Sequence, residues 1–79
     1  MGLLPEEEVV LNIFKAYEIE PGEYLSVQTL DRERMKVPRR IQENWDILLK
    51  SLVKEGYTIR DLLGYGLTEK GHHQLRDSE

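Results

Sequence analysis

The sequence predicts a small α+β domain in which helices lead into a β-hairpin and a short helix closes the chain. Apolar residues recur at helical spacing in residues 5–17 and again in residues 38–56. Directly after the second run, "YTIRDLLGYGL" alternates apolar and polar residues on both sides of a reversal. A chain of 79 residues has room for one core. We therefore expect one domain over residues 1–79, with an ordered core from about residue 5 to about residue 75.

The first helix is predicted to begin at Pro5, because proline suits the first helical position, where its missing N–H would have no partner. Three glutamates follow directly, and their charge is favourable near the positive end of the helix dipole. Helical spacing gives an apolar face made of Val9, Val10, Ile13, Phe14 and Tyr17. The Pro–Gly turn in "EPGE" ends this helix.

The segment from Leu25 to Val37 allows two interpretations. Tyr24, Leu25 and Val27 fit a short strand, whereas Ser26 fits the cap of a short helix that runs to about Arg34. We favour a brief extended piece followed by a short helix.

A long amphipathic helix is predicted over "PRRIQENWDILLKSLVKEG", from Pro38 to Gly56. Proline suits its first turn, and glycine suits the left-handed cap that ends it. One stripe at helical spacing consists of Ile41, Trp45, Leu48, Leu49, Leu52 and Val53, so the tryptophan is expected in the core. The opposite face carries Arg39, Arg40, Glu43, Asp46, Ile47, Lys50 and Lys54.

A β-hairpin is predicted directly after Gly56. The reversal lies in "DLLG", where Gly64 is free to take a positive φ. An isolated hairpin is barely stable in water, so this one must pack against the helices. The side chains expected to face inward are Tyr57, Ile59, Tyr65 and Leu67. Thr68 is a suitable N-cap for the last helix.

Charge is unevenly distributed along the chain, whose net charge is −4. Residues 1–24 hold six acids and one lysine, whereas "RERMKVPRR" (Arg32–Arg40) holds five bases and one acid. Local potential steers a polyanion, so this basic stretch is compatible with nucleic acid. Alternatively, these bases are solvated and pair with neighbouring acids, Arg39 or Arg40 with Glu43 and Lys50 with Asp46.

Several function classes are not expected. The chain has no cysteine, no signal-peptide pattern and no apolar run of about 20 residues, so we expect a cytoplasmic protein without a membrane span. His72 and His73 are adjacent and point about 100° apart on a helix, so no metal site is expected. There is no phosphate-binding glycine loop and no plausible catalytic triad in so small a chain. We expect no enzyme and no cofactor.

Two motifs give the sequence a resemblance to winged helix-turn-helix domains. "LLKSLVKEGY" (Leu48–Tyr57) resembles the end of the recognition helix in these families. "GLTEKG" (Gly66–Gly71) resembles the step from the wing to the final helix in MarR-like and PadR-like regulators, and in small YjcQ-type proteins of bacteria and their phages. The predicted order of elements is the same. The resemblance implies a three-helix core with a hairpin wing and a short C-terminal helix. It also implies a transcriptional regulator that binds double-stranded DNA. Such a regulator could be encoded by a phage or another mobile element.

By this resemblance the long helix would enter the major groove, and the hairpin would reach a neighbouring groove. The candidate DNA-contacting residues are Arg32, Arg34, Lys36, Arg39, Arg40, Gln42, Asn44, Lys50 and Arg60. Glu43 and Asp46 depart from the family pattern, since DNA-reading helices generally avoid acids near phosphates. The alternative is a protein-binding winged helix that uses the face around Ile47 or the acidic first helix. Both the DNA-binding and the protein-binding alternative are compatible with a homodimer.

Overall fold

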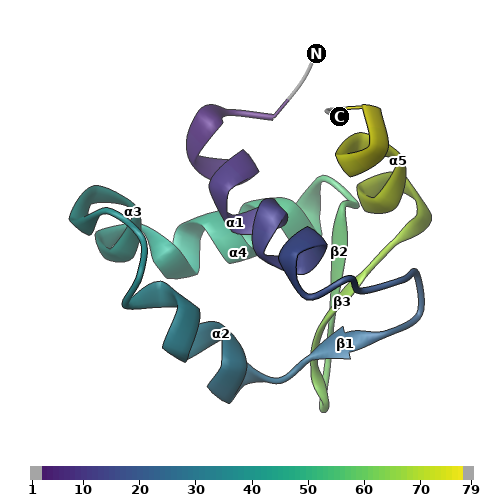
Figure 1. Ribbon diagram of the computed structural model, residues 1–79, viewed down its shortest axis with the longest axis horizontal. Helices are drawn as coiled ribbons and strands as arrows, with labels where there is room; N and C mark the ends of the chain where they lie inside the picture. The colour runs from purple at the N-terminus through teal and green to yellow at the C-terminus, as the bar shows by residue number, and fades with distance from the viewer. Residues whose placement is uncertain (1–2, 78–79) are drawn as a thin grey trace.

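The structure is a computed structural model that describes residues 3–77. Within these residues, five helices and a small antiparallel sheet make up the fold (Figure 1). The elements in chain order are α1 (Pro5–Ala16), β1 (Tyr24–Leu25), α2 (Val27–Arg34), α3 (Arg39–Glu43), α4 (Trp45–Lys54), β2 (Thr58–Asp61), β3 (Gly64–Leu67) and α5 (Glu69–Asp77). The α+β prediction and the hairpin after Gly56 are confirmed.

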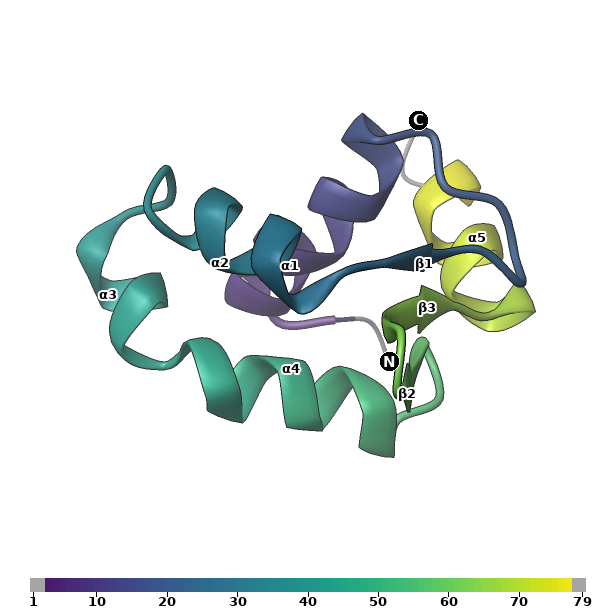
Figure 2. The same cartoon turned by 90° about the horizontal axis from the view of Figure 1, so that it is seen from below.

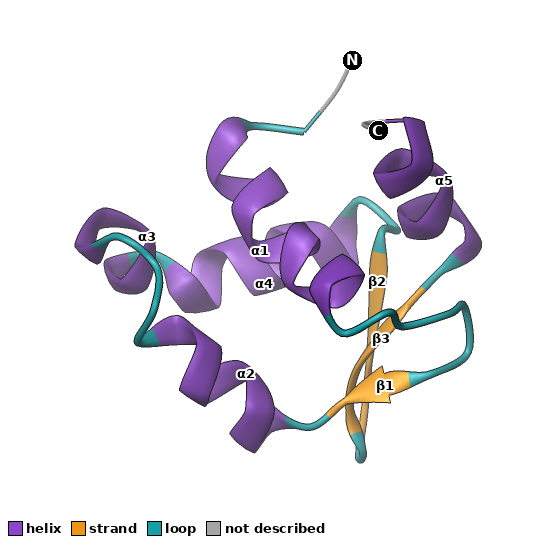
Figure 3. Cartoon of the chain, in the orientation of Figure 1, coloured by secondary structure: helices purple, strands orange, loops and turns teal. Residues whose placement is uncertain are grey.

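The sheet has three strands in the order β1-β3-β2 (Figure 3). In the hairpin, Asp61 pairs with Gly64, so the reversal needs only two residues between them. Gly64 has a φ of 138°, and a Cβ there would overlap the backbone of Leu25 in β1. The predicted brief extended piece followed by a short helix is confirmed as β1 and α2. The pairing of β1 with the hairpin, where Tyr24 pairs with Gly66, is an addition to the prediction. This order of elements is compatible with a winged helix.

Local signals predicted the starts of α1, α2 and α5 correctly. Pro5 is the first residue of α1. The Ser26 hydroxyl accepts a hydrogen bond from the Thr29 N–H at 3.1 Å, as an N-cap does. Likewise, the Thr68 hydroxyl accepts from the Gly71 N–H at 3.0 Å at the start of α5.

The prediction of one continuous helix from Pro38 to Gly56 is wrong. The chain forms α3 and α4, separated at Asn44, whose φ of −104° and ψ of 14° are not helical. Asparagine is a poor helix former because its side chain competes for backbone hydrogen bonds. Here its side-chain amide donates to the Arg40 carbonyl at 3.2 Å. The break leaves the same stripe facing inward, since Ile41, on its N-terminal side, and Trp45 are both buried.

The core lies where α1 crosses α4 and the sheet closes one end (Figure 1). Its buried apolar side chains are Val10, Leu11, Ile13, Phe14, Leu25, Leu30, Ile41, Trp45, Leu48, Leu49, Leu52, Tyr57, Leu67 and Leu75. Glu7 is also buried, with 2% exposure, and its carboxylate accepts from the Ser51 hydroxyl at 2.6 Å. This hydrogen bond joins α1 to α4 across the core.

The prediction that Ile59 faces inward is wrong. Ile59 is 41% exposed, whereas Thr58 is buried. The strand begins at Thr58, one residue later than predicted, because Gly56 and Tyr57 still belong to the cap of α4: the Tyr57 N–H bonds to the Leu52 carbonyl at 3.0 Å. Along β2 only Thr58 is buried, and Ile59, Arg60 and Asp61 are all exposed, so the predicted two-residue alternation of burial is absent.

Tyr17, the last residue of the apolar face predicted for α1, lies at the C-cap of that helix and is exposed. Tyr17 points its hydroxyl to the Glu33 carboxylate, 2.8 Å away, rather than into the core. Leu11, which the predicted face omitted, is fully buried. The buried face of α1 is therefore shifted toward Leu11.

Candidate nucleic-acid interface

The helices α3 and α4 expose seven side chains, six of them charged, and we call these residues together the α3–α4 face. Its exposed side chains are Arg39, Arg40, Glu43, Asp46, Ile47, Lys50 and Lys54. Figure 2 shows α3 and α4 along one side of the molecule, with the β2–β3 hairpin at the end of α4 farther from α3. The same helices turn their apolar stripe to the core, so the face is held on a rigid support.

The side chains of Arg39 and Arg40, at the start of this face, are only weakly held by other residues. The Arg39 side chain is 90% exposed, and its Nε lies 3.6 Å from the Glu43 carboxylate. Such an exposed pair contributes only about 0.3–0.5 kcal/mol, so a stronger anion can displace it. Arg40 is exposed as well. The predicted pairing of Lys50 with Asp46 is not among the ion pairs of residues 3–77.

Arg34 and Gln42, both predicted as DNA contacts, instead tie the turn between α2 and α3 together. The Arg34 guanidinium donates from Nε (3.2 Å) and Nη2 (2.9 Å) to the backbone carbonyl of Gln42. The Gln42 side chain donates to the Val37 carbonyl at 2.9 Å. Asn44 is likewise engaged with the Arg40 carbonyl. These three side chains have a role inside the fold, and their contact with DNA stays a prediction.

The remaining bases of the predicted set lie at the edges of the face. Arg32 is exposed on α2. Lys36 follows α2 and donates to Glu33 at 3.1 Å. Arg60 is on β2, where its guanidinium carbon lies 4.8 Å from the centre of the Tyr65 ring. Arg39, Arg40 and Lys50 are therefore exposed on α3 and α4, whereas Arg60 lies on the hairpin.

A small polar cluster fixes the end of α1 against the end of α2. The hydrogen bonds from Tyr17 and then from Lys36 hold the pKa of the Glu33 carboxyl below its usual range. The same bond to Glu33 raises the pKa of the Tyr17 hydroxyl. Glu33 is therefore charged near neutral pH, and it offsets part of the positive charge of the basic stretch Arg32–Arg40, in which it lies.

The hairpin tip carries two exposed leucines that the sequence analysis did not single out. Leu62 and Leu63 fill the two-residue reversal, and both side chains are exposed. The Asp61 carboxylate accepts from the Leu62 N–H and from the Tyr24 hydroxyl, so the tip is held by β1 as well. Leucines in "DLLG", where turns usually carry polar residues, were the available signal.

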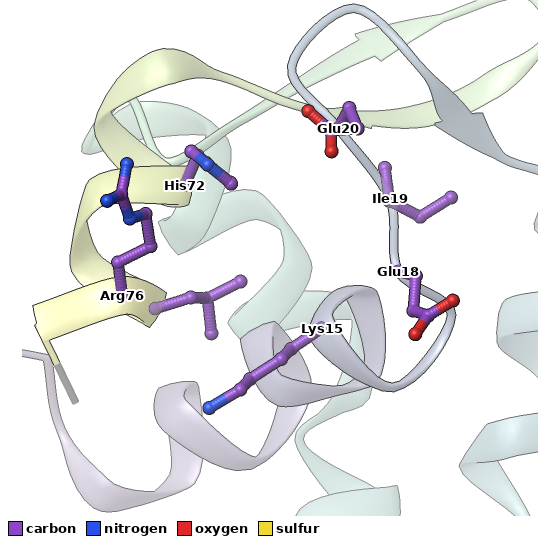
Figure 4. A pocket seen from close by; sticks show the side chains of 7 residues that line it. Lys15, Glu18, Ile19, Glu20, His72 and Arg76 are labelled. Atoms are coloured by element: carbon purple, nitrogen blue, oxygen red, sulfur yellow. The ribbon is translucent and has the colours of Figure 1, made fainter. Parts of the chain in front are cut away.

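A cavity of about 370 Å³ lies away from the α3–α4 face, between the end of α1 and α5 (Figure 4). Ile19 and Leu75 give it apolar walls, and the polar residues around it are Lys15, Glu18, Glu20, His72 and Arg76. No predicted site residue lines it. His72 and His73 lie edge to face, and residues 3–77 contain no group of three ligands suited to a metal ion.

Comparison of the chain with models of protein families, with curated proteins and with solved structures finds no match. Within residues 3–77, the helices are all too short or too polar to cross a membrane.

Proposed function

We propose that this chain is a winged helix-turn-helix protein that binds double-stranded DNA, with the α3–α4 face in the major groove, and that it acts as a transcriptional regulator of the MarR-like, PadR-like or YjcQ type. The observation that carries the proposal is the exposure of Arg39 and Arg40 at the start of α3, in a turn braced by the Arg34–Gln42 bonds. In helix-turn-helix proteins the N-terminal residues of the second helix lie nearest the DNA.

The expected contacts are electrostatic in the first place. Arg39, Arg40, Lys50 and, from α2, Arg32 are exposed bases that can reach phosphates of the two backbones flanking a groove. Arg60 would approach the DNA from the hairpin. The net charge of −4 weakens the long-range attraction between the protein and DNA. Phosphates within about 8 Å of the arginine and lysine side chains nevertheless respond mainly to the local positive charge.

A second candidate is a winged helix that binds a protein. The observation that favours it is the exposure of Ile47, whose side chain is 66% accessible on an otherwise polar face. In that version Ile47 would be the apolar centre of a protein contact.

Titration of the purified chain with a fluorescent random 20-base-pair duplex tests the proposal. DNA binding that disappears in the Arg39→Glu, Arg40→Glu double variant supports it. The matched control is Lys15→Glu with Arg76→Glu, which makes the same charge change beside the cavity of Figure 4 and should keep most of the binding. Absence of binding by the parent even at low salt would contradict it and favour the protein-binding version.

A further inference from the structure

The α3–α4 face has an order of charges that a simple phosphate-binding surface would not have. Arg39 and Arg40 stand at one end, and Lys50 and Lys54 stand at the other. Between the two basic ends lie two acids and one apolar residue, namely Glu43, Asp46 and Ile47, all exposed. Acids repel phosphates, so the middle of the face is unsuited to the DNA backbone.

This order matches the cross-section of a major groove. Arg40 lies in α3 and Lys50 lies in α4, on opposite sides of the break at Asn44. The groove is about 12 Å wide and is flanked by a phosphate backbone on each side. If each basic end meets one backbone, the middle of the face lies over the base edges, away from phosphate charge.

The side chains in the middle fit pyrimidines. Ile47 is apolar and 66% exposed, and the only apolar group on the major-groove edge of a base pair is the methyl group of thymine. A carboxylate can only accept hydrogen bonds, and cytosine presents the N4 amino group as a donor. Adenine also has a donor, its N6 amino group, but the neighbouring N7 is an acceptor and repels a carboxylate. Of the two acids, Glu43 lies close to Arg39, whereas Asp46 has no ion-pair partner among residues 3–77.

We propose that the centre of the α3–α4 face reads adjacent pyrimidines, thymine through its methyl group at Ile47 and cytosine through its amino group at Asp46. This inference rests on the proposed function. It also gives a role to the two features of the face, its acids and its exposed isoleucine, that phosphate binding alone leaves unexplained.

The experiment selects bound sequences from a random duplex pool with the full chain. The selected duplexes are then prepared with thymine and with uracil, which lacks the methyl group. Loss of one buried methyl should weaken binding about fourfold. Ile47→Ala should remove this difference between the thymine and uracil forms, whereas Leu4→Ala, at an equally exposed leucine before α1, should preserve it.

A second arm uses Asp46→Asn, because asparagine pairs best with adenine. Selection with this variant should replace cytosine by adenine at one position. The proposal is overturned if the parent binds the thymine and uracil forms equally, or if Asp46→Asn keeps the cytosine. Both outcomes leave DNA binding itself intact. If the parent binds no duplex at all, the proposed function fails first, so the two failures are distinguishable.

Discussion

The guanidinium of Arg34, at the end of α2, donates two hydrogen bonds to the backbone carbonyl of Gln42 in α3. In an uninterrupted helix that carbonyl would accept from the N–H of residue 46. The chain leaves helical geometry at Asn44, and the Gln42 carbonyl accepts from a backbone N–H of the α3 cap as well as from the arginine. The arginine thus joins the end of α2 to α3 next to the break between α3 and α4.

Arg34→Lys should therefore destabilise the protein although it keeps the charge. A lysine cannot form the two-pronged contact, and loss of charged hydrogen bonds to a half-buried carbonyl should cost about 1–2 kcal/mol. Urea unfolding followed by circular dichroism measures the loss. The exposed Arg32→Lys is the control and should change the free energy of unfolding very little. Equal stability of the two variants would show that Arg34 is not a brace.

Glu18→Gly should stabilise the protein. Glu18 follows the C-cap of α1 and is the only non-glycine among residues 3–77 with a positive φ, at 56°. Glycine is the residue that this left-handed position favours, and the gain should be about 0.5–1 kcal/mol. Thermal unfolding of this variant and of Glu20→Gly, where φ is ordinary, gives the comparison. A loss of stability in Glu18→Gly would contradict the assignment of strain there.

Tyr17→Phe should raise the pKa of the Glu33 carboxyl. The Tyr17 hydroxyl is the main cause of its lowered pKa, and Lys36 would keep part of the effect. Because the folded-state pKa is lowered, Glu33 adds stability above its usual pKa, and this is lost as pH falls through the folded value. Proton titration of the Glu33 side chain by NMR measures the change. An unchanged titration in the variant would rule out the hydroxyl as the cause.

Gly71→Ala should destabilise the contact between α5 and the start of the hairpin. An added Cβ would overlap the carbonyl oxygen of Tyr57, which is backbone and cannot turn aside. Overpacking of this kind costs about 1–3 kcal/mol. Chemical unfolding should show that loss, with Glu69→Ala, exposed two residues earlier in α5, as the reference. A variant as stable as the parent would mean that α5 can move away freely.

Features that depend on neighbouring residues could be predicted from the sequence. Pro5, Ser26 and Thr68 mark helix starts through their own chemistry, and "DLLG" gave the position of the reversal. The break at Asn44 was missed because the apolar stripe runs through it unchanged.

Features set by distant residues could not be predicted. The Arg34 guanidinium meets a carbonyl eight residues away, so charge alone made it resemble a phosphate contact. The burial of Thr58 in place of Ile59 depends on where the cap of α4 ends and β2 begins, and the alternation of residue types does not reveal that point. For the candidate site, the sequence could indicate the basic side chains. It could not indicate which of them would form hydrogen bonds within the fold.

The salt dependence of duplex binding tests the central claim, that the α3–α4 face binds DNA through its exposed bases. Four phosphate contacts, from Arg32, Arg39, Arg40 and Lys50, predict that log K falls against log salt with a slope of about −3 to −4. An Arg39→Ala, Arg40→Ala double variant, which loses the two contacts without adding repelling charges, should make that slope shallower by about 2. A slope near zero in the parent, or the same slope in parent and double variant, would contradict the claim.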